Sequence, residues 1–128
     1  MSRTGLWDSH AHLDDEAFNE DRAQLIAQLE QDMDGIVNPG CDAASSAVAV
    51  ELAEKYPFIY AAVGWHPENL KDIPVDYLQQ LAEWAQHPKV VAIGEIGLDY
   101  YWKENEPKEA QKRIFLEQID LAKQFDLP

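Results

Sequence analysis

The sequence predicts an α/β fold in which four strand–helix units form one parallel sheet. Four short apolar runs are each followed by a longer segment in which apolar residues recur at the spacing of an amphipathic helix. Strands that are apolar along their whole length are typical of parallel sheets covered by helices. Two architectures fit this order: a small doubly wound sheet, and one half of an eight-fold strand–helix barrel.

The first two units occupy the first half of the chain. Residues 5–7 form a short apolar run that leads into Asp8, and residues 35–40 form a second run closed by turn residues. Apolar residues at helical spacing between these runs predict a single helix over about residues 16–33. Asp42 has the short polar side chain of a helix N-cap. The helix that follows it is expected to bury Ala44, Ala47, Val48 and Leu52.

The last two units are bounded by prolines. Pro57 ends the second helix, and residues 58–63 then form a third strand that is apolar on both faces. Pro88 ends a third helix, whose apolar positions are Leu78, Leu81, Ala82 and Ala85. Residues 90–93 form the fourth strand. Residues 105–107 provide a cap and a first-turn proline for the last helix, which carries Ile114, Phe115, Ile119, Ala122 and Phe125.

Length and charge exclude some classes of protein. A chain of 128 residues has the size of one domain, and its net charge of −14 repels nucleic acid and acidic membranes. This argues against a module that binds DNA by electrostatics alone, although bound divalent cations can invert the local field. No apolar run approaches the roughly 18 to 20 residues of a membrane span. Residues 1–5 precede no long apolar segment and Cys41 is the only cysteine, so we expect no signal peptide, no internal disulfide and a cytoplasmic location.

Polar residues gather at the predicted carboxyl ends of the strands, where parallel folds build their active sites. In chain order they are His10 and His12, Asn38, His66, and Glu95 with Asp99. His10 and His12 are two residues apart, so both imidazoles point to the same side of an extended chain and can chelate a divalent ion. Burying a carboxylate at the mouth of an apolar strand requires a compensating cation or proton, so Glu95 is predicted to bind metal or to act as an acid or base. The alternative is a glutamate that caps a solvated turn.

Four further features have two explanations each. Asp8 either fixes the tautomer of a histidine ligand or makes a hydrogen bond at the strand end. Asn38 either donates a hydrogen bond into the site or closes a turn. Cys41 is expected to be a small buried thiol rather than a ligand. The aromatic residues near the site are expected to pack at the rim of a barrel rather than to stack on bases; they are Trp65, Tyr100, Tyr101 and Trp102.

Three motifs resemble those of the TatD family, a group of metal-dependent deoxyribonucleases. They are residues 8–12 (Asp-Ser-His-Ala-His), residues 64–67 (Gly-Trp-His-Pro) and residues 94–100 (Gly-Glu-Ile-Gly-Leu-Asp-Tyr), and the third is the most specific. Residues 111–128 are similar to the helix that leads into that family's fifth strand. The resemblance implies that residues 1–128 form a single incomplete domain, the N-terminal half of a TIM-type (β/α)8 barrel with four βα units.

The resemblance also implies a site and an activity. By it, His10 and His12 bind one divalent ion and Glu95 bridges two, with zinc, manganese or magnesium as candidates. His66 acts with Glu95 in catalysis and faces the substrate phosphate or the attacking water, while Asp99 supports the loop. The implied reaction is hydrolysis of phosphodiester bonds in DNA, acting from the ends of strands as an exonuclease.

The family's remaining ligands are histidines after the fifth and sixth strands and an aspartate after the eighth, which four units do not include. We therefore expect the 128-residue chain to be inactive alone. We also expect it to expose two strand edges and an apolar interior, through which it can self-associate. Two other functions are open: a metal amidohydrolase or phosphoesterase acting on a small molecule, and a non-catalytic half-barrel assembly module.

Overall fold

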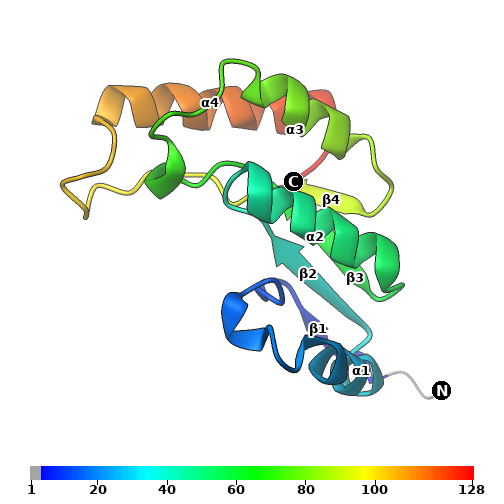
Figure 1. Ribbon diagram of the computed structural model, residues 1–128. Coiled ribbons are helices and arrows are strands. Elements are labelled where there is room, and N and C mark those ends of the chain that lie inside the picture. The colour runs from blue at the N-terminus through cyan, green and yellow to red at the C-terminus, as the bar shows by residue number, and fades with distance from the viewer. Residues whose placement is uncertain (1–3) are drawn as a thin grey trace.

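A computed structural model describes residues 4–128 (Figure 1). Residues 1–3 lie outside the described residues, and they belong to the segment on which the expectation of no signal peptide rests. None of the helices in the described part of the chain is both long enough and apolar enough to cross a membrane. The elements, in chain order, are β1 (Trp7–Asp8), the 3₁₀ helix η1 (Glu16–Phe18), α1 (Arg22–Asp32), β2 (Gly35–Pro39), α2 (Ala43–Lys55), β3 (Ile59–Val63), the 3₁₀ helix η2 (Pro67–Asn69), α3 (Tyr77–Ala85), β4 (Val90–Ile93) and α4 (Lys108–Gln124).

The four strands form one parallel sheet in the order β1-β2-β3-β4. Trp7 lies opposite Gly35, Ile36 lies opposite Ile59, and the register between β3 and β4 shifts after Ala61. Helix α2 packs on β3 and β2, α3 packs on β4 and β3, and α4 packs on β4 and α3. The predicted parallel strand–helix order is therefore confirmed. A doubly wound sheet reverses its strand order at a switch point, and residues 4–128 show no such reversal, so this sheet follows the barrel order.

The sheet buries one face and leaves the other partly open. Ile36, Ile59 and Val63 are at most 1% exposed. On the opposite face, Tyr60 is only half-buried and Trp7 is 55% exposed, with their ring centroids 5.5 Å apart. The Trp7 ring also fills the place that a side chain at residue 35, a glycine, would occupy.

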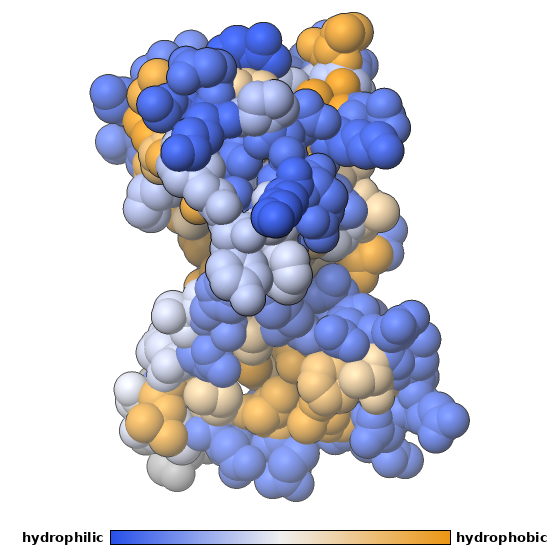
Figure 2. All heavy atoms as spheres, turned by 90° about the vertical axis from the view of Figure 1, so that its left-hand side faces the viewer, coloured by the Kyte–Doolittle hydropathy of each residue, from blue (hydrophilic) through white to orange (hydrophobic). Residues whose placement is uncertain are grey.

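The expectation that residues 58–63 are buried on both faces is therefore wrong at Tyr60. The reason is that, among residues 4–128, no further strand lies across the open face of the sheet. Figure 2 shows apolar residues gathered in the lower part of that view, at the height where Figure 1 places β1 and α1. Apolar surface of this kind is what a partly built barrel leaves in contact with solvent.

The single helix expected over residues 16–33 is also wrong, because the chain forms η1, a turn and then α1. The Asp15 side chain caps η1. Arg22 folds back over this turn, and its guanidinium donates to the Leu13 carbonyl at 2.7 Å, to the Asp15 carbonyl at 2.8 Å and to the Asn19 side chain at 2.8 Å. These contacts tie the start of α1 to the segment before η1 and to the turn between the two helices, so they hold the chain in its broken path.

Helix α2 begins as predicted but turns a different face to the sheet. Asp42 and Ser45 form a reciprocal capping box at its start. Ala44 and Val48, which we expected to be buried, are exposed, and Ala47 is only half-buried. The buried residues are Ser46, Ala49, Val50, Leu52 and Ala53. Small apolar residues occur all round this helix, so the sequence admits more than one buried face and the contact with β2 and β3 selects between them.

Helix α4 holds two strand-end loops through buried glutamine side chains. The Gln118 carboxamide accepts from the Trp65 N–H at 2.8 Å and donates to the Trp65 carbonyl at 3.1 Å. The Gln111 carboxamide makes the same pair of contacts with Asp99, at 2.9 and 3.1 Å. Each glutamine therefore satisfies backbone groups that no strand partner reaches. The buried polar residues among those described are Asn38, Ser46, Gln111 and Gln118.

We predict that Gln118→Met lowers the free energy of unfolding by about 2 to 4 kcal/mol. The substitution keeps the volume of the side chain but leaves the buried N–H and carbonyl of Trp65 unpaired, and each unpaired group costs about 1 to 3 kcal/mol. Chemical denaturation measures the change. Gln124→Met, at an exposed position of the same helix, is the control and should change stability by less than about 0.5 kcal/mol. Equal effects of the two substitutions would contradict a stabilising role for the hydrogen bonds between Gln118 and the backbone of Trp65.

Candidate metal site

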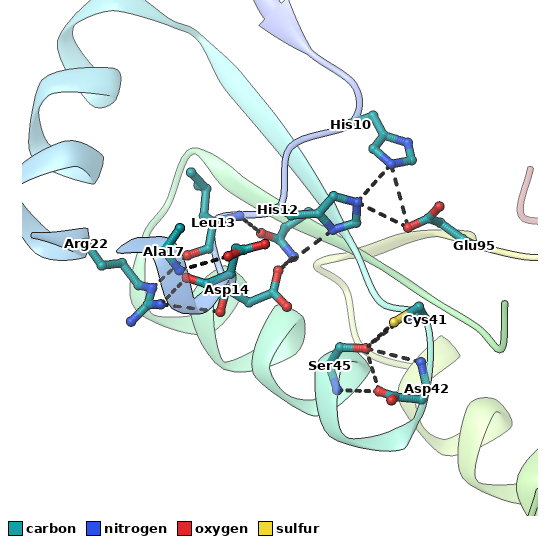
Figure 3. Close-up of polar contacts among 12 residues, drawn as sticks. His10, His12, Leu13, Asp14, Ala17, Arg22, Cys41, Asp42, Ser45 and Glu95 are labelled. Atoms are coloured by element: carbon teal, nitrogen blue, oxygen red, sulfur yellow. Dashed lines mark hydrogen bonds and ion pairs between the residues drawn. The ribbon is translucent and has the colours of Figure 1, made fainter. Parts of the chain in front are cut away.

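Three side chains of types that can bind a metal converge at the carboxyl end of the sheet (Figure 3). His10 and His12 lie in the loop after β1, and Glu95 follows β4 by two residues. The Nε2 atoms of the two histidines are 3.1 Å apart, and they lie 3.6 Å (His10) and 3.2 Å (His12) from Oε2 of Glu95. Strands β1 and β4 are opposite edges of the sheet. The sheet must therefore curve for these side chains to meet, as it does in a barrel.

Backbone contacts between neighbouring strand ends hold Glu95 in place. The Gly94 N–H donates to the Val63 carbonyl at 2.9 Å, and the Glu95 N–H donates to the Gly40 carbonyl at 2.7 Å. The peptide bond between Gly94 and Glu95 is cis. A Cβ atom at Gly64 would lie 2.9 Å from the carbonyl carbon of Gly94. Glycine at residue 64 therefore allows the loop after β4 to approach β3 closely.

The three side chains fit a divalent ion. In tetrahedral coordination with bonds of about 2.0 to 2.2 Å, ligand atoms lie about 3.4 Å from one another. The three separations here, 3.1, 3.2 and 3.6 Å, bracket that value. Two imidazoles and one carboxylate are also a ligand set that zinc and manganese accept. Among the described residues this is the one group of three such side chains whose ligand atoms all lie within 4.8 Å of one another.

The loop after β1 is held by a carboxylate that the sequence analysis missed. Asn38 on β2 is fully buried, and its side-chain oxygen accepts from the Leu13 N–H at 2.6 Å while its amino group donates to Oδ1 of Asp14 at 3.1 Å. The same Asp14 oxygen lies 3.9 Å from Nδ1 of His12. Asn38 thus closes a loop rather than donating a hydrogen bond to His10, His12 or Glu95. The position of Asp14, two residues after His12, is the signal that could have found it.

Asp8 makes the strand-end hydrogen bond that was one of its two explanations. Its Oδ1 accepts from the backbone N–H of His10 at 3.0 Å. Asp99 organises its own loop, because its Oδ1 accepts from the Tyr101 N–H at 2.9 Å while Gln111 holds its backbone. Both aspartates therefore act on loop backbone, outside the group of three ligands.

His66 is not one of the group of three; it lines a cavity that His12 and Glu95 also line. Its Nδ1 accepts from the Glu68 N–H at 3.1 Å, so the ring hydrogen is on Nε2. The cavity has a volume of about 340 Å³ and is lined by His12, Asp14, Asp15, Cys41, His66, Glu68, Asn69 and Glu95. The structure thus brings both histidine ligands, His66 and Glu95 to one end of the sheet, as the sequence analysis expected.

The aromatic residues near the site divide into two groups. Trp65 is 3% exposed and packs edge-to-face on Tyr77, with 5.7 Å between ring centroids. The expectation of packing is therefore confirmed for Trp65. Tyr100, Tyr101 and Trp102 are between 46% and 80% exposed in the loop after β4. For these three, burial by packing at a rim is wrong for the described chain: Tyr101 and Trp102 pack edge-to-face on each other and Lys108 lies over the Tyr100 ring, but these contacts leave the rings exposed.

Cys41 is a half-buried thiol on the wall of the same cavity, with Sγ 3.3 Å from Oγ of Ser45. Burial raises the pKa of this thiol, and the negative charges of Asp42 and Glu95 raise that pKa further. The geometry therefore agrees with a small buried thiol.

The sequence model of the TatD related DNase family matches residues 7–128. A metal-dependent hydrolase of Bacillus subtilis named YabD is 44% identical over 124 residues, which cover 96% of this chain and 48% of the relative. A protein of Pectobacterium parmentieri named 3'-5' ssDNA/RNA exonuclease TatD is 32% identical over 125 residues, covering 96% of this chain and 48% of the relative.

A solved structure agrees with the fold. The crystal structure of YjjV, a TatD homologue from Escherichia coli, superposes with a TM-score of 0.83 at 36% identity over 96% of this chain and 48% of that chain. The match confirms that the four parallel βα units have the architecture of part of a TatD-type TIM barrel. The chain spans about half the length of the curated relatives it matches.

We predict that Cys41 reacts slowly with iodoacetamide at pH 8 and that its rate reaches half-maximum at a higher pH than that of a free cysteine. The thiolate is the reactive form, and a raised pKa leaves less thiolate at a given pH. Mass spectrometry of alkylation against pH measures the profile. Alkylation of the unfolded protein in urea should restore the ordinary profile, and a native midpoint at or below it would disprove the prediction.

Proposed function

Because this chain belongs to the TatD related DNase family, we propose that it carries part of the metal centre of a hydrolase that cleaves phosphodiester bonds in DNA. The observation that supports this most is the convergence of His10, His12 and Glu95 from opposite edges of the sheet. Relatives named metal-dependent hydrolases support the hydrolase class. A cytoplasmic location, suggested by the single cysteine, is part of the proposal.

In this proposal His10, His12 and Glu95 are the metal ligands, and Glu95 also contacts a second ion. When bound, two divalent ions would lower the pKa of a water molecule and stabilise the charge on the leaving oxygen. The chain's own residues set where this happens. The backbone contact of Glu95 with Gly40 holds the carboxylate at the wall of the cavity, and the two imidazoles lie directly beside it.

His66 is proposed to bind a phosphate oxygen of the substrate. Its Nδ1 already accepts from the Glu68 N–H, so Nε2 is the atom that carries a hydrogen and can donate. It lies on the wall of the cavity that Glu95 also lines. A phosphodiester oxygen accepts hydrogen bonds, whereas a water molecule to be activated must give up a proton. Of the two roles considered for His66, donation to phosphate is therefore the one that its hydrogen bonding supports.

Single-stranded DNA, trimmed from its ends, is the proposed substrate. The relative named 3'-5' ssDNA/RNA exonuclease supports this choice, and the exposed Tyr100, Tyr101 and Trp102 lie in the loop that begins at the metal cluster. Exposed aromatic rings are suited to stack on unpaired bases. Cyclic amides and phosphate monoesters represent the alternative, a hydrolase of small molecules.

We predict that Glu95→Ala removes nearly all divalent-metal-dependent cleavage of short single-stranded DNA. The test uses a protein of the full length of its relatives that contains residues 1–128. Loss of a bridging carboxylate should weaken metal binding as well as turnover. Cleavage is followed on end-labelled oligonucleotides, with cyclic amides and phosphate monoesters as comparison substrates.

Glu109→Ala is the matched control, because this carboxylate is exposed on α4 away from the site. It should retain wild-type cleavage. Calorimetric titration of the 128-residue chain with Zn²⁺ should show the same order, with Glu95→Ala weakened and Glu109→Ala unchanged. Wild-type-like cleavage by Glu95→Ala would refute the assignment, and faster turnover of the small molecules would favour the alternative.

The open face and edges of the sheet support a further part of the proposal, self-association of the 128-residue chain. Strands β1 and β4 are the edges of the described sheet, and Leu6 and Trp7 at the β1 edge are 58% and 55% exposed. Unpaired edges beside apolar surface favour pairing between chains. Such pairing would serve the assembly-module alternative and is compatible with the hydrolase.

We predict that the chain forms concentration-dependent dimers or larger species in light scattering, and that Leu6→Lys shifts it toward monomer. The charge at the β1 edge opposes pairing there. Val75→Lys is the control, because Val75 is fully exposed between η2 and α3, away from the sheet edges. A wild-type monomer at all concentrations that binds no apolar dye would exclude this part of the proposal.

A further inference from the structure

We propose that Asp14, held by Asn38, is a positioning residue that orients the imidazole of His12 toward the metal site. The inference rests on the proposed metal site for its purpose, although the orientation itself can be measured without metal. It assigns to Asp14 the role that the sequence analysis considered for Asp8.

Asn38 is the fixed point of this arrangement. It lies on β2, opposite Ala61 of the parallel strand β3, and its side chain is fully buried. Its side-chain oxygen accepts from the Leu13 N–H at 2.6 Å, so its amino group must be the end that meets Asp14. The orientation of the amide is thereby determined, and it presents a donor to Oδ1 of Asp14 at 3.1 Å.

The Asp14 carboxylate lies on the side of His12 that faces away from the metal ligands. Its Oδ1 is 3.9 Å from Nδ1 of the ring, while Nε2 on the other side is 3.2 Å from Oε2 of Glu95. The ring is therefore placed between two carboxylates, as Figure 3 shows. The separation of 3.9 Å exceeds a hydrogen bond, so at this distance Asp14 acts on the ring through its charge.

When Nε2 of His12 binds an ion, this placement suits one tautomer of the ring. A neutral imidazole carries one hydrogen and one lone pair on its two nitrogens. With the N–H of Nδ1 directed at Asp14, the lone pair of Nε2 points at the position shared with His10 and Glu95. A carboxylate behind a metal-binding histidine typically fixes both the tautomer and the direction of the ring.

The neighbouring aspartates do not share this geometry. Oδ1 of Asp8 accepts from the backbone N–H of His10 rather than from a ring. Oδ1 of Asp15 accepts from the Ala17 N–H at 2.8 Å and caps η1. Asp14 is the one of these three whose carboxylate lies within 4.0 Å of a histidine ring nitrogen in the described structure.

The test compares Asp14→Asn with Asp15→Asn in the 128-residue protein. Both substitutions remove one negative charge from the same loop, and Asn at residue 15 can still cap η1. Zn²⁺ alone is titrated by calorimetry. We expect Asp14→Asn to weaken Zn²⁺ binding about 10- to 100-fold, the range typical for loss of a group behind a metal ligand, and Asp15→Asn to change it by less than about twofold.

A second measurement reads the orientation without metal. NMR couplings that report the side-chain torsions of His12 should show one ring orientation in the wild type, and Asp14→Asn should populate a second orientation. A purely structural role of Asp14 would lower stability without changing this distribution.

The outcomes separate the two proposals. A His12 ring orientation that is the same in Asp14→Asn and the wild type, or equal Zn²⁺ affinities of the two proteins, would overturn the positioning role. If the wild-type chain binds no Zn²⁺ at all, the metal site fails, and the NMR result alone then decides whether Asp14 orients His12.

Discussion

The hydrogen bonds between buried polar side chains and the backbone of the loops are the interaction on which this structure depends. A parallel strand ends in a loop whose N–H and carbonyl groups have left the sheet but remain buried, and each such group must find a partner. Asn38 supplies it for the loop after β1, Ser46 and Gln118 for the loop after β3, and Gln111 for the loop after β4. The polar residues of the core are thus the ones that place the loops bearing the site.

The candidate site follows from this arrangement because its three side chains come from distant strands. Two imidazoles from the loop after β1 reach a carboxylate after β4 only where the sheet curves and its strand ends stand close together. Glycine at residue 64 removes the side chain that would keep the loop after β4 at a distance. Backbone contacts therefore place the proposed metal site, and helix α4 contributes to it without carrying any of the three side chains.

Much of the architecture could be predicted from the sequence, because apolar runs and turn residues record the strands directly. The convergence of His10, His12 and Glu95 could be predicted too, since they sit at strand ends in a spacing that suits a metal. Asp14 could not, because its role depends on the buried amide of Asn38, 24 residues later in the chain. The break before α1 depends in the same way on the carbonyls that Arg22 reaches, and the buried face of α2 depends on its packing against β2 and β3. In each case a tertiary contact decides between local patterns that the sequence leaves equivalent.

Trp7 lies over the glycine at residue 35 on the open face of the sheet, in the space that a side chain at residue 35 would occupy. The contact is made by the six-membered part of the indole ring, and Trp7 is 55% exposed. A larger residue at position 35 would therefore push the indole outward into solvent rather than strain the strand. The ring would then lose its contact with Tyr60, so the glycine sets how closely this indole covers the open face and how much apolar surface the face presents to solvent.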